Sequence, residues 1–316
     1  MRPTPQELSL FVKHKASSLG FSLCGITGAL PPKRTEFFDW WVNMGFGAGM
    51  HYLRNQIKRR RSIEAILPGA RSVIVCAMRF PSGEPGDSPR EEGKPYGKVA
   101  RYALHEDYHS RILPLLEELA LALDGAAGTA GSKAYVDTGP LSERALASQA
   151  GIGWVGKHSL LIHKDQGSWL WLGEIVSRAE LALDEPSADH CGTCRRCIDA
   201  CPTGAILESL RSVDSRKCLS YWNIEHRGEI PQELHRPMGN WLLGCDICQE
   251  VCPWNAQSVR RGLPEPNIEW VNVEELLSLS KEEFNRRYGD RAVGRARYEG
   301  IRRNAKIVKK NFKSEL

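Results

Sequence analysis

The hydrophobic positions of the chain repeat with two different periods, and these periods predict its elements. Residues 6–19 place apolar side chains at helical spacing and end at Gly20, a common residue at a helix C-terminus. Two apolar runs follow, FSLCGIT (21–27) and RSVIVCAMRF (71–80), and both predict strands. The chain is therefore expected to begin with a helix and two strands.

The same alternation of helical and strand patterns continues to about residue 180. The expected elements are a helix over 99–125, a strand and turn over 132–140, a short helix over 141–151, and strands over 159–163 and 168–176. Residues 81–95 are rich in Gly, Pro, Ser and acidic side chains, so we expect a long exposed loop. The last 45 residues carry no strand signal and look helical. This order predicts an α+β protein.

Composition is that of an ordinary globular protein. The chain has 316 residues, of which 41% are hydrophobic and 26% charged, enough for about two domains. The start, MRPTPQELSL, has no apolar signal-peptide core. No apolar run approaches the roughly 20 residues that span a bilayer. We therefore expect a cytoplasmic protein without a membrane partner.

The charge is unevenly distributed. Residues 284–313 hold eleven Lys or Arg against Asp290 and Glu299, a local net charge of +9 in a chain whose total is +5. The remainder of the chain is therefore at −4. A basic end on an otherwise acidic protein suggests a polyanionic partner.

Eight of the ten cysteines form two related groups. The first reads Cys191-x2-Cys194-x2-Cys197-x3-Cys201-Pro202, and the second is Cys218 followed by Cys245-x2-Cys248-x3-Cys252-Pro253. This is the spacing of two-cluster ferredoxins, in which three close cysteines hold one four-iron cluster and the cysteine before proline ligates the other. We assign Cys191, Cys194, Cys197 and Cys252 to one 4Fe-4S cluster, and Cys201, Cys218, Cys245 and Cys248 to the second.

Structural zinc is the alternative for these cysteines, because Cys-x2-Cys pairs also suit tetrahedral zinc. Zinc sites rarely add a third cysteine three residues later and then Cys-Pro, so iron-sulfur clusters and one-electron transfer are favoured. A disulfide framework is less compatible with a chain of this length that carries no export signal. Cys24 and Cys76 lie in the predicted strands and are expected to be small buried hydrophobic residues.

Three short motifs suggest other chemistry, and none is convincing alone. His105 to His109 matches the H-E-x-x-H pattern of zinc proteases, but no third ligand follows. Gly151 to His158 approaches a phosphate-binding loop, yet it follows a predicted helix and has His158 in place of Ser or Thr. Asp137-Thr138-Gly139 matches the aspartic protease triplet, but it occurs once, so a turn role is the simpler interpretation.

Taken together, several of these stretches resemble the epoxyqueuosine reductase family. The resemblance is carried by Tyr135 to Arg144, Gly151 to Ser159, Gly173-Glu174, the cysteine pattern, and Cys245 to Gln249. It extends from Phe21 to Arg303-Asn304-Ala305. Members of that family carry two 4Fe-4S clusters and cobalamin, and they reduce epoxyqueuosine at the tRNA wobble position to queuosine. The resemblance thus supplies an acceptor for the electrons of the clusters.

The resemblance also implies a fold and a set of site residues. The implied fold has a nitroreductase- and reductive-dehalogenase-like cobalamin domain over 1–180, a ferredoxin-like domain over 181–262, and a basic helical segment over 263–316 that contacts tRNA. Asp137 matches the proposed proton donor, and it would need a raised pKa to be protonated near neutral pH. The residues that match cobalamin-contacting regions are Arg60, Arg101, Tyr102, Asp137, Lys157, Ser159, Ser220 and Asp246.

The basic end now has an implied substrate. Arg286, Arg287, Arg302, Arg303, Lys309 and Lys310 are expected to neutralise phosphates of the anticodon stem-loop. Many family members continue with additional helical repeats beyond the point that corresponds to Leu316. We expect a monomer that receives electrons from an unidentified reductant or electron-transfer protein.

Two other functions compete with this one. A reductive dehalogenase would share both cofactors, but it normally carries an export signal and needs no basic end. An iron-sulfur electron carrier without catalysis would leave Asp137 as a turn residue only. Replacing that aspartate by asparagine separates the second alternative from an enzyme.

Overall fold

The computed structural model describes residues 3–80, 91–103, 106–266 and 269–315. The chain divides into two compact units, and each unit combines segments from separate parts of the sequence. Unit 1 consists of residues 1–45, 51–79 and 109–194, and unit 2 of residues 46–50, 80–108 and 195–316. None of the helices in the described ranges is both long enough and apolar enough to cross a membrane.

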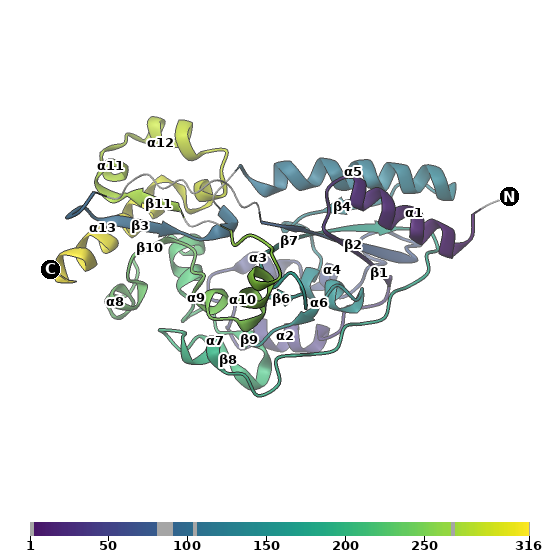
Figure 1. The fold of residues 1–316 in the computed structure, drawn as a ribbon, viewed down its shortest axis with the longest axis horizontal. Helices are drawn as coiled ribbons and strands as arrows, with labels where there is room; N and C mark the ends of the chain where they lie inside the picture. The colour runs from purple at the N-terminus through teal and green to yellow at the C-terminus, as the bar shows by residue number, and fades with distance from the viewer. Residues whose placement is uncertain (1–2, 81–90, 104–105, 267–268, 316) are drawn as a thin grey trace. The chain divides into compact units, whose positions relative to one another are not determined.

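Unit 1 is built on one antiparallel sheet with helices on both faces (Figure 1). Its elements are α1 (Pro5–Ser18), β1 (Leu23–Gly28), α2 (Thr35–Asn43), α3 (His51–Asn55), α4 (Ile57–Arg60), β2 (Ser72–Arg79), α5 (Tyr108–Ala127), β4 (Lys133–Tyr135), α6 (Glu143–Gln149), β5 (Trp154–Val155), β6 (Leu161–Ile162) and β7 (Leu170–Ser177). The four-stranded sheet has the order β1-β2-β7-β4. The strands and helices predicted for this part of the chain are therefore confirmed, with shorter bounds for several of them.

The sheet separates two hydrophobic layers. Because side chains alternate along a strand, Gly173 of β7 faces α5, where an added Cβ would lie 2.5 Å from Leu116. Its neighbour Glu174 faces the opposite layer, which contains Val75 of β2 and Leu146 of α6. One face is thus covered by α5 and the other by α6.

The long helix expected over 99–125 begins later than predicted. Residues 96–99 form β3, Arg101–Ala103 is a 3-10 turn, and α5 starts only at Tyr108. Strand β3 pairs in parallel with β10 and antiparallel with β11, so pairing with strands about 140 to 170 residues later overrides the local helical pattern. Residues 81–90 of the expected loop lie outside the described residues.

Unit 2 is organised around the three-stranded sheet β10-β3-β11. Its elements are β3 (Tyr96–Val99), η1 (Arg101–Ala103), α7 (Arg196–Asp199), β8 (Ile206–Leu207), η2 (Glu208–Leu210), β9 (Ser212–Val213), η3 (Tyr221–Glu225), η4 (Gln232–Leu234), α8 (His235–Met238), β10 (Trp241–Leu243), α9 (Ile247–Glu250), α10 (Pro253–Arg260), β11 (Glu269–Asn272), α11 (Val273–Ser278), α12 (Lys281–Tyr288), η5 (Ala292–Ala296) and α13 (Arg297–Glu315). The C-terminal part, expected to be helical, also supplies strand β11.

A buried polar network ties helix α13 to the strand that precedes the second cysteine group. Asn304 is fully buried and donates to the carbonyls of Asn223 (2.7 Å) and Leu242 (2.9 Å). The Asn223 side chain in turn bonds both the N–H and the C=O of Gly244, at 2.8 Å each. Satisfied buried amides of this kind fix one backbone arrangement. The network therefore positions the residue next to Cys245.

Candidate functional site

Asp137 lies in a strained turn just beyond strand β4 of unit 1. Its φ is +52°, and the N–H of Thr138 donates to the carbonyl of Val136 at 2.5 Å. A bond from residue i+2 to residue i with positive φ at the central residue is the rarer and more strained kind of γ-turn. Non-glycine residues held in such backbone conformations cluster at active sites. The candidate aspartate is thus the central residue of this turn.

Two side chains hold the turn in place. The N–H of Asp137 donates to Oε1 of Glu143 at 2.6 Å. The guanidinium of Arg60 donates to the carbonyls of Gly139 (3.2 Å) and Leu141 (2.5 Å), on the segment that leads into α6. Arg60 therefore binds the backbone that follows the aspartate, and Glu143 binds the aspartate itself.

Burial determines the protonation of the two glutamates beneath the turn. Desolvation, followed by the charge of Asp137, raises the pKa of Glu143 from 4.5 to about 7. Glu174 is fully buried, and desolvation followed by the charge of Glu143 raises its pKa well above 4.5. The two carboxyl groups interact with each other, although neither oxygen of Glu174 completes a hydrogen bond of good geometry. At least one proton therefore resides on this pair at neutral pH.

The second half of the site in unit 1 follows the short strand β5. Ser159 has a φ of +66°, and its carbonyl accepts a 2.6 Å hydrogen bond from Arg144. Lys157 is buried, with 8% of its surface exposed. Burial lowers the pKa of His158 to about 4, so this imidazole is neutral at physiological pH. Its Nε2 is buried without a hydrogen-bond partner among the described residues.

The motifs that suggested other chemistry do not form the sites they imply. Helix α5 begins at Tyr108, so Glu106 precedes it and the H-E-x-x-H pattern does not lie on one helix; His105 lies outside the described residues. His109 instead places Nε2 3.5 Å from Oδ2 of Asp137. The glycine stretch leads from α6 into β5, which is the reverse of the strand-to-helix order of a phosphate-binding loop. Gly153 is required because an added Cβ would lie 2.2 Å from the carbonyl oxygen of Ile162.

In unit 2, Cys201, Cys218, Cys245 and Cys248 are near enough for their charges to act on one another. The charges of Cys201 and Cys218 act on Cys245, and those of Cys218 and Cys245 act on Cys248. The backbone N–H of Ala205 donates to the sulfur of Cys201 at 3.3 Å. The backbone N–H groups of Ser220 and Tyr221 donate to the sulfur of Cys218. Amide donors aimed at thiolate sulfurs are characteristic of iron-sulfur ligation. The donor set therefore fits a 4Fe-4S cluster.

The other four cysteines divide between the units. Cys191 and Cys194 belong to unit 1, where the N–H of Cys194 donates to the carbonyl of Cys191 at 3.0 Å. Cys197 and Cys252 belong to unit 2 and are both buried. The ten cysteines all lie within the described ranges, and none of them forms a disulfide. Cys76 is buried as expected, whereas its cross-strand partner Cys24 is partly exposed.

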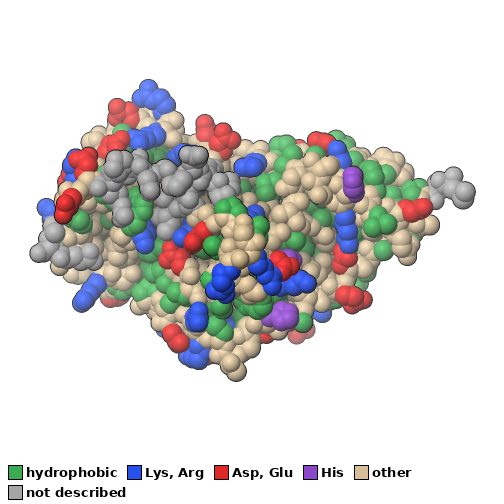
Figure 2. Space-filling model, in the orientation of Figure 1, with side chains coloured by type: hydrophobic (Ala, Val, Ile, Leu, Met, Phe, Trp, Pro, Cys, Tyr) green, Lys and Arg blue, Asp and Glu red, His purple; other side chains and the backbone are tan. Residues whose placement is uncertain are grey.

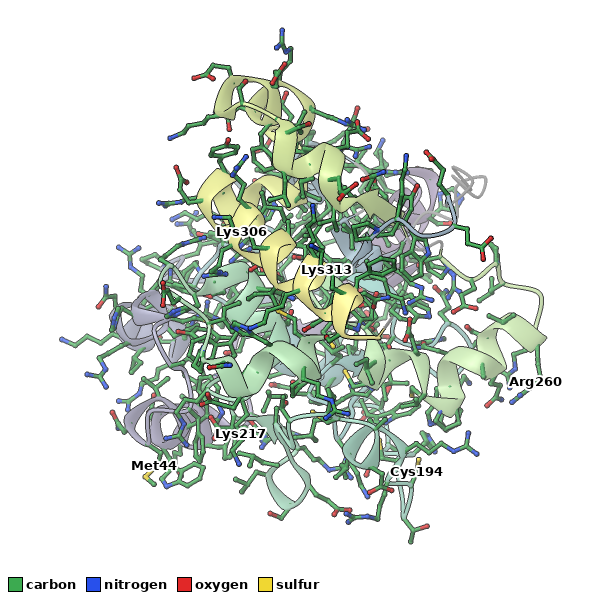
Figure 3. The ribbon with its side chains drawn as sticks, turned by 90° about the vertical axis from the view of Figure 1, so that its left-hand side faces the viewer. Met44, Cys194, Lys217, Arg260, Lys306 and Lys313 are labelled. Atoms are coloured by element: carbon green, nitrogen blue, oxygen red, sulfur yellow. The ribbon has the colours of Figure 1, made fainter. Side chains whose placement is uncertain are left out.

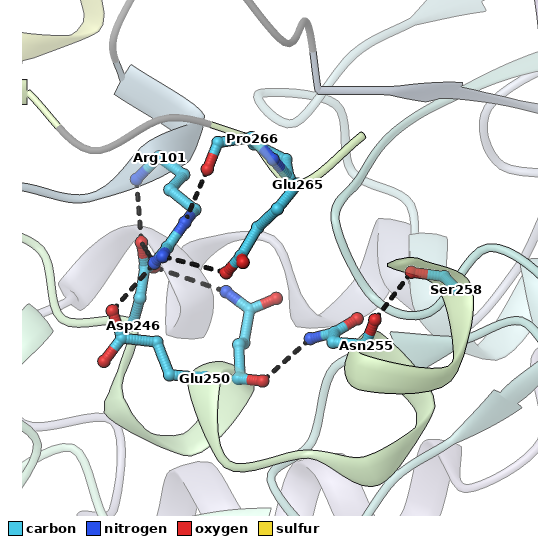
Figure 4. Close-up of polar contacts among 8 residues, drawn as sticks. Arg101, Asp246, Glu250, Asn255, Ser258, Glu265 and Pro266 are labelled. Atoms are coloured by element: carbon cyan, nitrogen blue, oxygen red, sulfur yellow. Dashed lines mark hydrogen bonds and ion pairs between the residues drawn. The ribbon is translucent and has the colours of Figure 1, made fainter. Parts of the chain in front are cut away.

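Arg101 and Asp246 contact each other instead of standing free for a ligand (Figure 4). The Arg101 N–H donates to Oδ2 of Asp246 at 2.8 Å, and its guanidinium bonds Glu250 (2.8 Å), Glu265 (3.1 Å) and the carbonyl of Pro266 (2.8 Å). Burial raises the pKa of Asp246 to about 6 against the opposing effect of Arg101. Both residues thus brace the loop that follows Cys245.

The eight predicted cofactor contacts fall into two groups of four. Arg60, Asp137, Lys157 and Ser159 belong to unit 1, and Arg101, Tyr102, Ser220 and Asp246 belong to unit 2. Tyr102 packs partly buried against the core of unit 2, and the Ser220 N–H faces the Cys218 sulfur. Within unit 1 the structure connects Arg60 with Asp137 through the turn they share.

Several basic residues expected to bind tRNA are engaged inside unit 2. Arg303 donates to the carbonyls of Trp222, His226 and Gly228, and Arg302 to that of Leu277. Arg287 and Lys309 pair with Glu275 and Glu274. Of the six predicted residues, Arg286, Arg287 and Lys310 are exposed, and Lys306 and Lys313, which were not predicted, are exposed on the same helix as Lys310. Lys306 and Lys313, labelled in Figure 3, lie with Lys310 at i, i+4 and i+7 on one face of α13.

Surface charge elsewhere is mixed. On the face drawn in Figure 2, basic and acidic side chains are interspersed. The stripe of Lys306, Lys310 and Lys313 on α13 is therefore the most regular basic feature of the C-terminal segment.

Glu143 and Glu174 lie in stretches that carry the family resemblance, but the resemblance gives neither glutamate a role. One local signal was available: Glu174 is the only charged residue in the apolar run SWLWLGEIV. A carboxylate at the centre of a buried strand requires compensation, and such residues are candidates for functional sites.

Comparison with known proteins identifies relatives over nearly the whole chain. The family model "4Fe-4S double cluster binding domain" matches residues 190–255, and "Epoxyqueuosine reductase QueG, DUF1730" matches residues 60–138. An epoxyqueuosine reductase of Gloeobacter violaceus is 37% identical over 97% of this chain and 96% of its own length.

Solved structures show the same fold. A crystal structure of epoxyqueuosine reductase with an epoxyqueuosine-modified tRNA-Tyr stem loop has a TM-score of 0.87 and 29% identity, covering 97% of this chain and 82% of that one. The enzyme of Bacillus subtilis, described with its catalytic aspartate loop swung out of the active site, has a TM-score of 0.87 and 28% identity over the same shares of the two chains.

Proposed function

The chain belongs to the epoxyqueuosine reductase family, and we propose that it reduces epoxyqueuosine in tRNA to queuosine with Asp137 as the proton donor. The observation that carries the role of Asp137 is its strained γ-turn, held by Glu143 and Arg60. A catalytic aspartate loop that moves has been described in the Bacillus subtilis relative. A turn held by a few side-chain bonds is suited to such movement.

Asp137 would act on the oxygen of the epoxide. When a carbon–oxygen bond of the epoxide breaks, negative charge develops on that oxygen, and a carboxylic acid within hydrogen-bond reach lowers the barrier by protonating it. His109 lies beside the carboxylate, with its Nε2 3.5 Å from Oδ2 of Asp137. Arg60 keeps the following backbone fixed while the proton moves.

The clusters would supply the electrons. We assign one 4Fe-4S cluster to Cys191, Cys194, Cys197 and Cys252, and the other to Cys201, Cys218, Cys245 and Cys248. Gly244 and Asn223 position Cys245, while Arg101 and Asp246 brace the segment after it. Hydrogen bonds to the sulfurs and burial set the potential of such clusters.

Cobalamin is the acceptor we propose for these electrons, and reduced cobalt would supply the strong donor that epoxide opening needs. The residues of unit 1 fit a large polar ligand, since the buried Nε2 of His158 has no hydrogen-bond partner among the described residues and the neighbouring Ser159 is held at positive φ. Arg60, Lys157 and Ser159 would hold it in unit 1. In unit 2, Tyr102 and Ser220 would contribute, whereas Arg101 and Asp246 would act through the loops they brace.

The tRNA interface we propose uses the exposed basic residues of the C-terminal segment, Arg286, Lys306, Lys310 and Lys313. They would bind phosphates without reading sequence, while the modified base is turned out of the anticodon loop. We propose functional regions over 1–180 for cobalamin, 181–262 for the clusters and 263–316 for tRNA. The protein would act as a monomer in the cytoplasm with a separate reductant.

The direct test is conversion of tRNA that carries epoxyqueuosine by anaerobically reconstituted protein with cobalamin and a chemical reductant. Nucleoside mass spectrometry should show queuosine in place of epoxyqueuosine, and no conversion without cobalamin. Protein that holds both clusters, binds cobalamin and still leaves epoxyqueuosine unchanged would contradict the proposal.

A further inference from the structure

Removing the oxygen of an epoxide consumes more protons than one aspartate holds. Both carbon–oxygen bonds break, a carbon–carbon double bond forms, and the oxygen leaves as water, which requires two electrons and two protons. The reduced cofactors supply the electrons, and Asp137 carries one proton. A second proton must therefore reach the oxygen during each turnover.

The glutamate pair beneath Asp137 is placed to store that proton. Glu174 projects from the middle of β7 into the layer covered by α6, and none of its surface is exposed. Glu143 is the first residue of α6, and its carboxyl group interacts with that of Glu174. Two ionised carboxylates close together, one of them fully buried, would be strongly destabilising. A shared proton is the way to keep both side chains there.

Glu143 also connects the pair to the candidate donor. Its Oε1 accepts the N–H of Asp137 at 2.6 Å, which brings its carboxyl group next to the turn. We propose that Glu143 and Glu174 hold one proton in common and return it through Glu143 to Asp137 after the first protonation, so that the three carboxyl groups supply both protons that leave in water. This inference rests on the role of Asp137 proposed above.

The charged groups around the pair favour this storage. The charge of Asp137 raises the pKa of both glutamates, whereas Arg144 lowers that of Glu143 and Arg60 lowers that of Glu174. The pKa of Glu143 is about 7, so this residue can both hold and release a proton near neutral pH. Loss of the proton from Asp137 makes its carboxylate the natural acceptor. Glu143 and Glu174 are thus positioning residues that act through Asp137.

The two roles of Glu143 can be separated by substitution. Glu143→Gln keeps an oxygen that accepts the Asp137 N–H but cannot carry a proton. Glu143→Ala removes both the acceptor and the proton. Glu118→Gln is the matched control, because Glu118 is an exposed glutamate of unit 1 that pairs with Lys15 on the surface.

The test combines infrared spectroscopy with a pH profile of turnover. In cluster-loaded protein labelled with ¹³C-glutamate, we expect a protonated carboxyl band that persists at neutral pH in wild type and Glu118→Gln and is lost in Glu174→Gln. Turnover of Glu143→Gln and Glu174→Gln should fall at least roughly tenfold. The alkaline limb of their profiles should move to lower pH, because solvent must then supply the second proton.

Two outcomes would overturn the inference. One is the absence of a protonated glutamate band at neutral pH in wild type. The other is a Glu143→Gln variant with the wild-type rate and pH profile beside an impaired Glu143→Ala, which would reduce Glu143 to an anchor for the turn. Neither outcome touches the donor role of Asp137, which fails separately if Asp137→Asn retains turnover.

Discussion

The backbone N–H of Asp137 donates a 2.6 Å hydrogen bond to the side chain of Glu143, six residues later at the start of α6. This bond joins a backbone turn in a sparsely populated conformation to a partly buried carboxyl group. The position of the candidate proton donor and the protonation of the group beneath it are therefore linked.

The positive φ of Asp137 predicts that two substitutions at this residue will differ in stability although both abolish turnover. At +52°, glycine should be favoured over alanine because it has no Cβ. We expect Asp137→Gly to be more stable than Asp137→Ala by about 1 kcal/mol in the free energy of unfolding, and therefore to unfold at a higher temperature. Both variants should lack turnover. Thermal denaturation of the two variants checks this, and equal melting temperatures would contradict a strained turn.

The raised pKa values of the glutamate pair predict a loss of stability at higher pH. In the unfolded chain Glu143 loses its proton near its ordinary pKa of 4.5, whereas in the folded protein it retains the proton up to about 7. Over this interval the folded state binds more protons, so the free energy of unfolding decreases as the pH rises.

Replacing the buried Glu174 should remove part of this loss of stability at higher pH. We expect Glu174→Gln to be more stable than wild type above neutral pH and to show a smaller decline in stability between pH 5 and pH 8, in the direction given by linkage. Chemical denaturation at a series of pH values measures it. Parallel curves for the variant and wild type would show that the pair carries no shared proton.

Gly244 offers a test of how the second cluster is positioned. Its φ is +69°, and an added Cβ would lie 2.4 Å from the Cβ of Ala100. Gly244→Ala should therefore displace the chain next to Cys245 and lower the iron content from about eight atoms per chain toward four. Gly262→Ala is the control, since Gly262 has a φ of +86° with open space around it. Equal iron content in both variants would contradict this placement.

The stripe on α13 predicts a salt-dependent contribution to tRNA binding. Replacing Lys306, Lys310 and Lys313 by Gln should weaken binding and reduce the slope of log affinity against log salt by about one for each phosphate that is no longer neutralised. Arg303→Gln is the contrasting variant, because its guanidinium bonds three internal carbonyls. It should lower the melting temperature and leave the slope unchanged. A slope that changes in Arg303→Gln but not in the triple lysine variant would place the interface elsewhere.

The sequence allowed β1, β2 and β7 to be predicted because each lies in a long, largely apolar run. It misplaced the start of α5, since β3 is fixed by pairing with β10 and β11, which lie far along the chain. The cysteine assignment came from spacing that the cluster geometry imposes. The Arg101–Asp246 contact and the internal bonds of Arg303 depend on tertiary structure and leave no local signal in the sequence. The family resemblance therefore implied a ligand role for Arg101 and Asp246, and charge suggested phosphate binding for Arg303.

The most direct measurement is single-turnover conversion of epoxyqueuosine in tRNA by Asp137→Asn and wild type, each loaded with both clusters and cobalamin. Asparagine keeps the size of the side chain and tolerates positive φ, but it carries no acidic proton. We expect Asp137→Asn to keep its cluster and cobalamin content and to react at least roughly a hundredfold more slowly than wild type. A wild-type rate in the variant would contradict Asp137 as the proton donor.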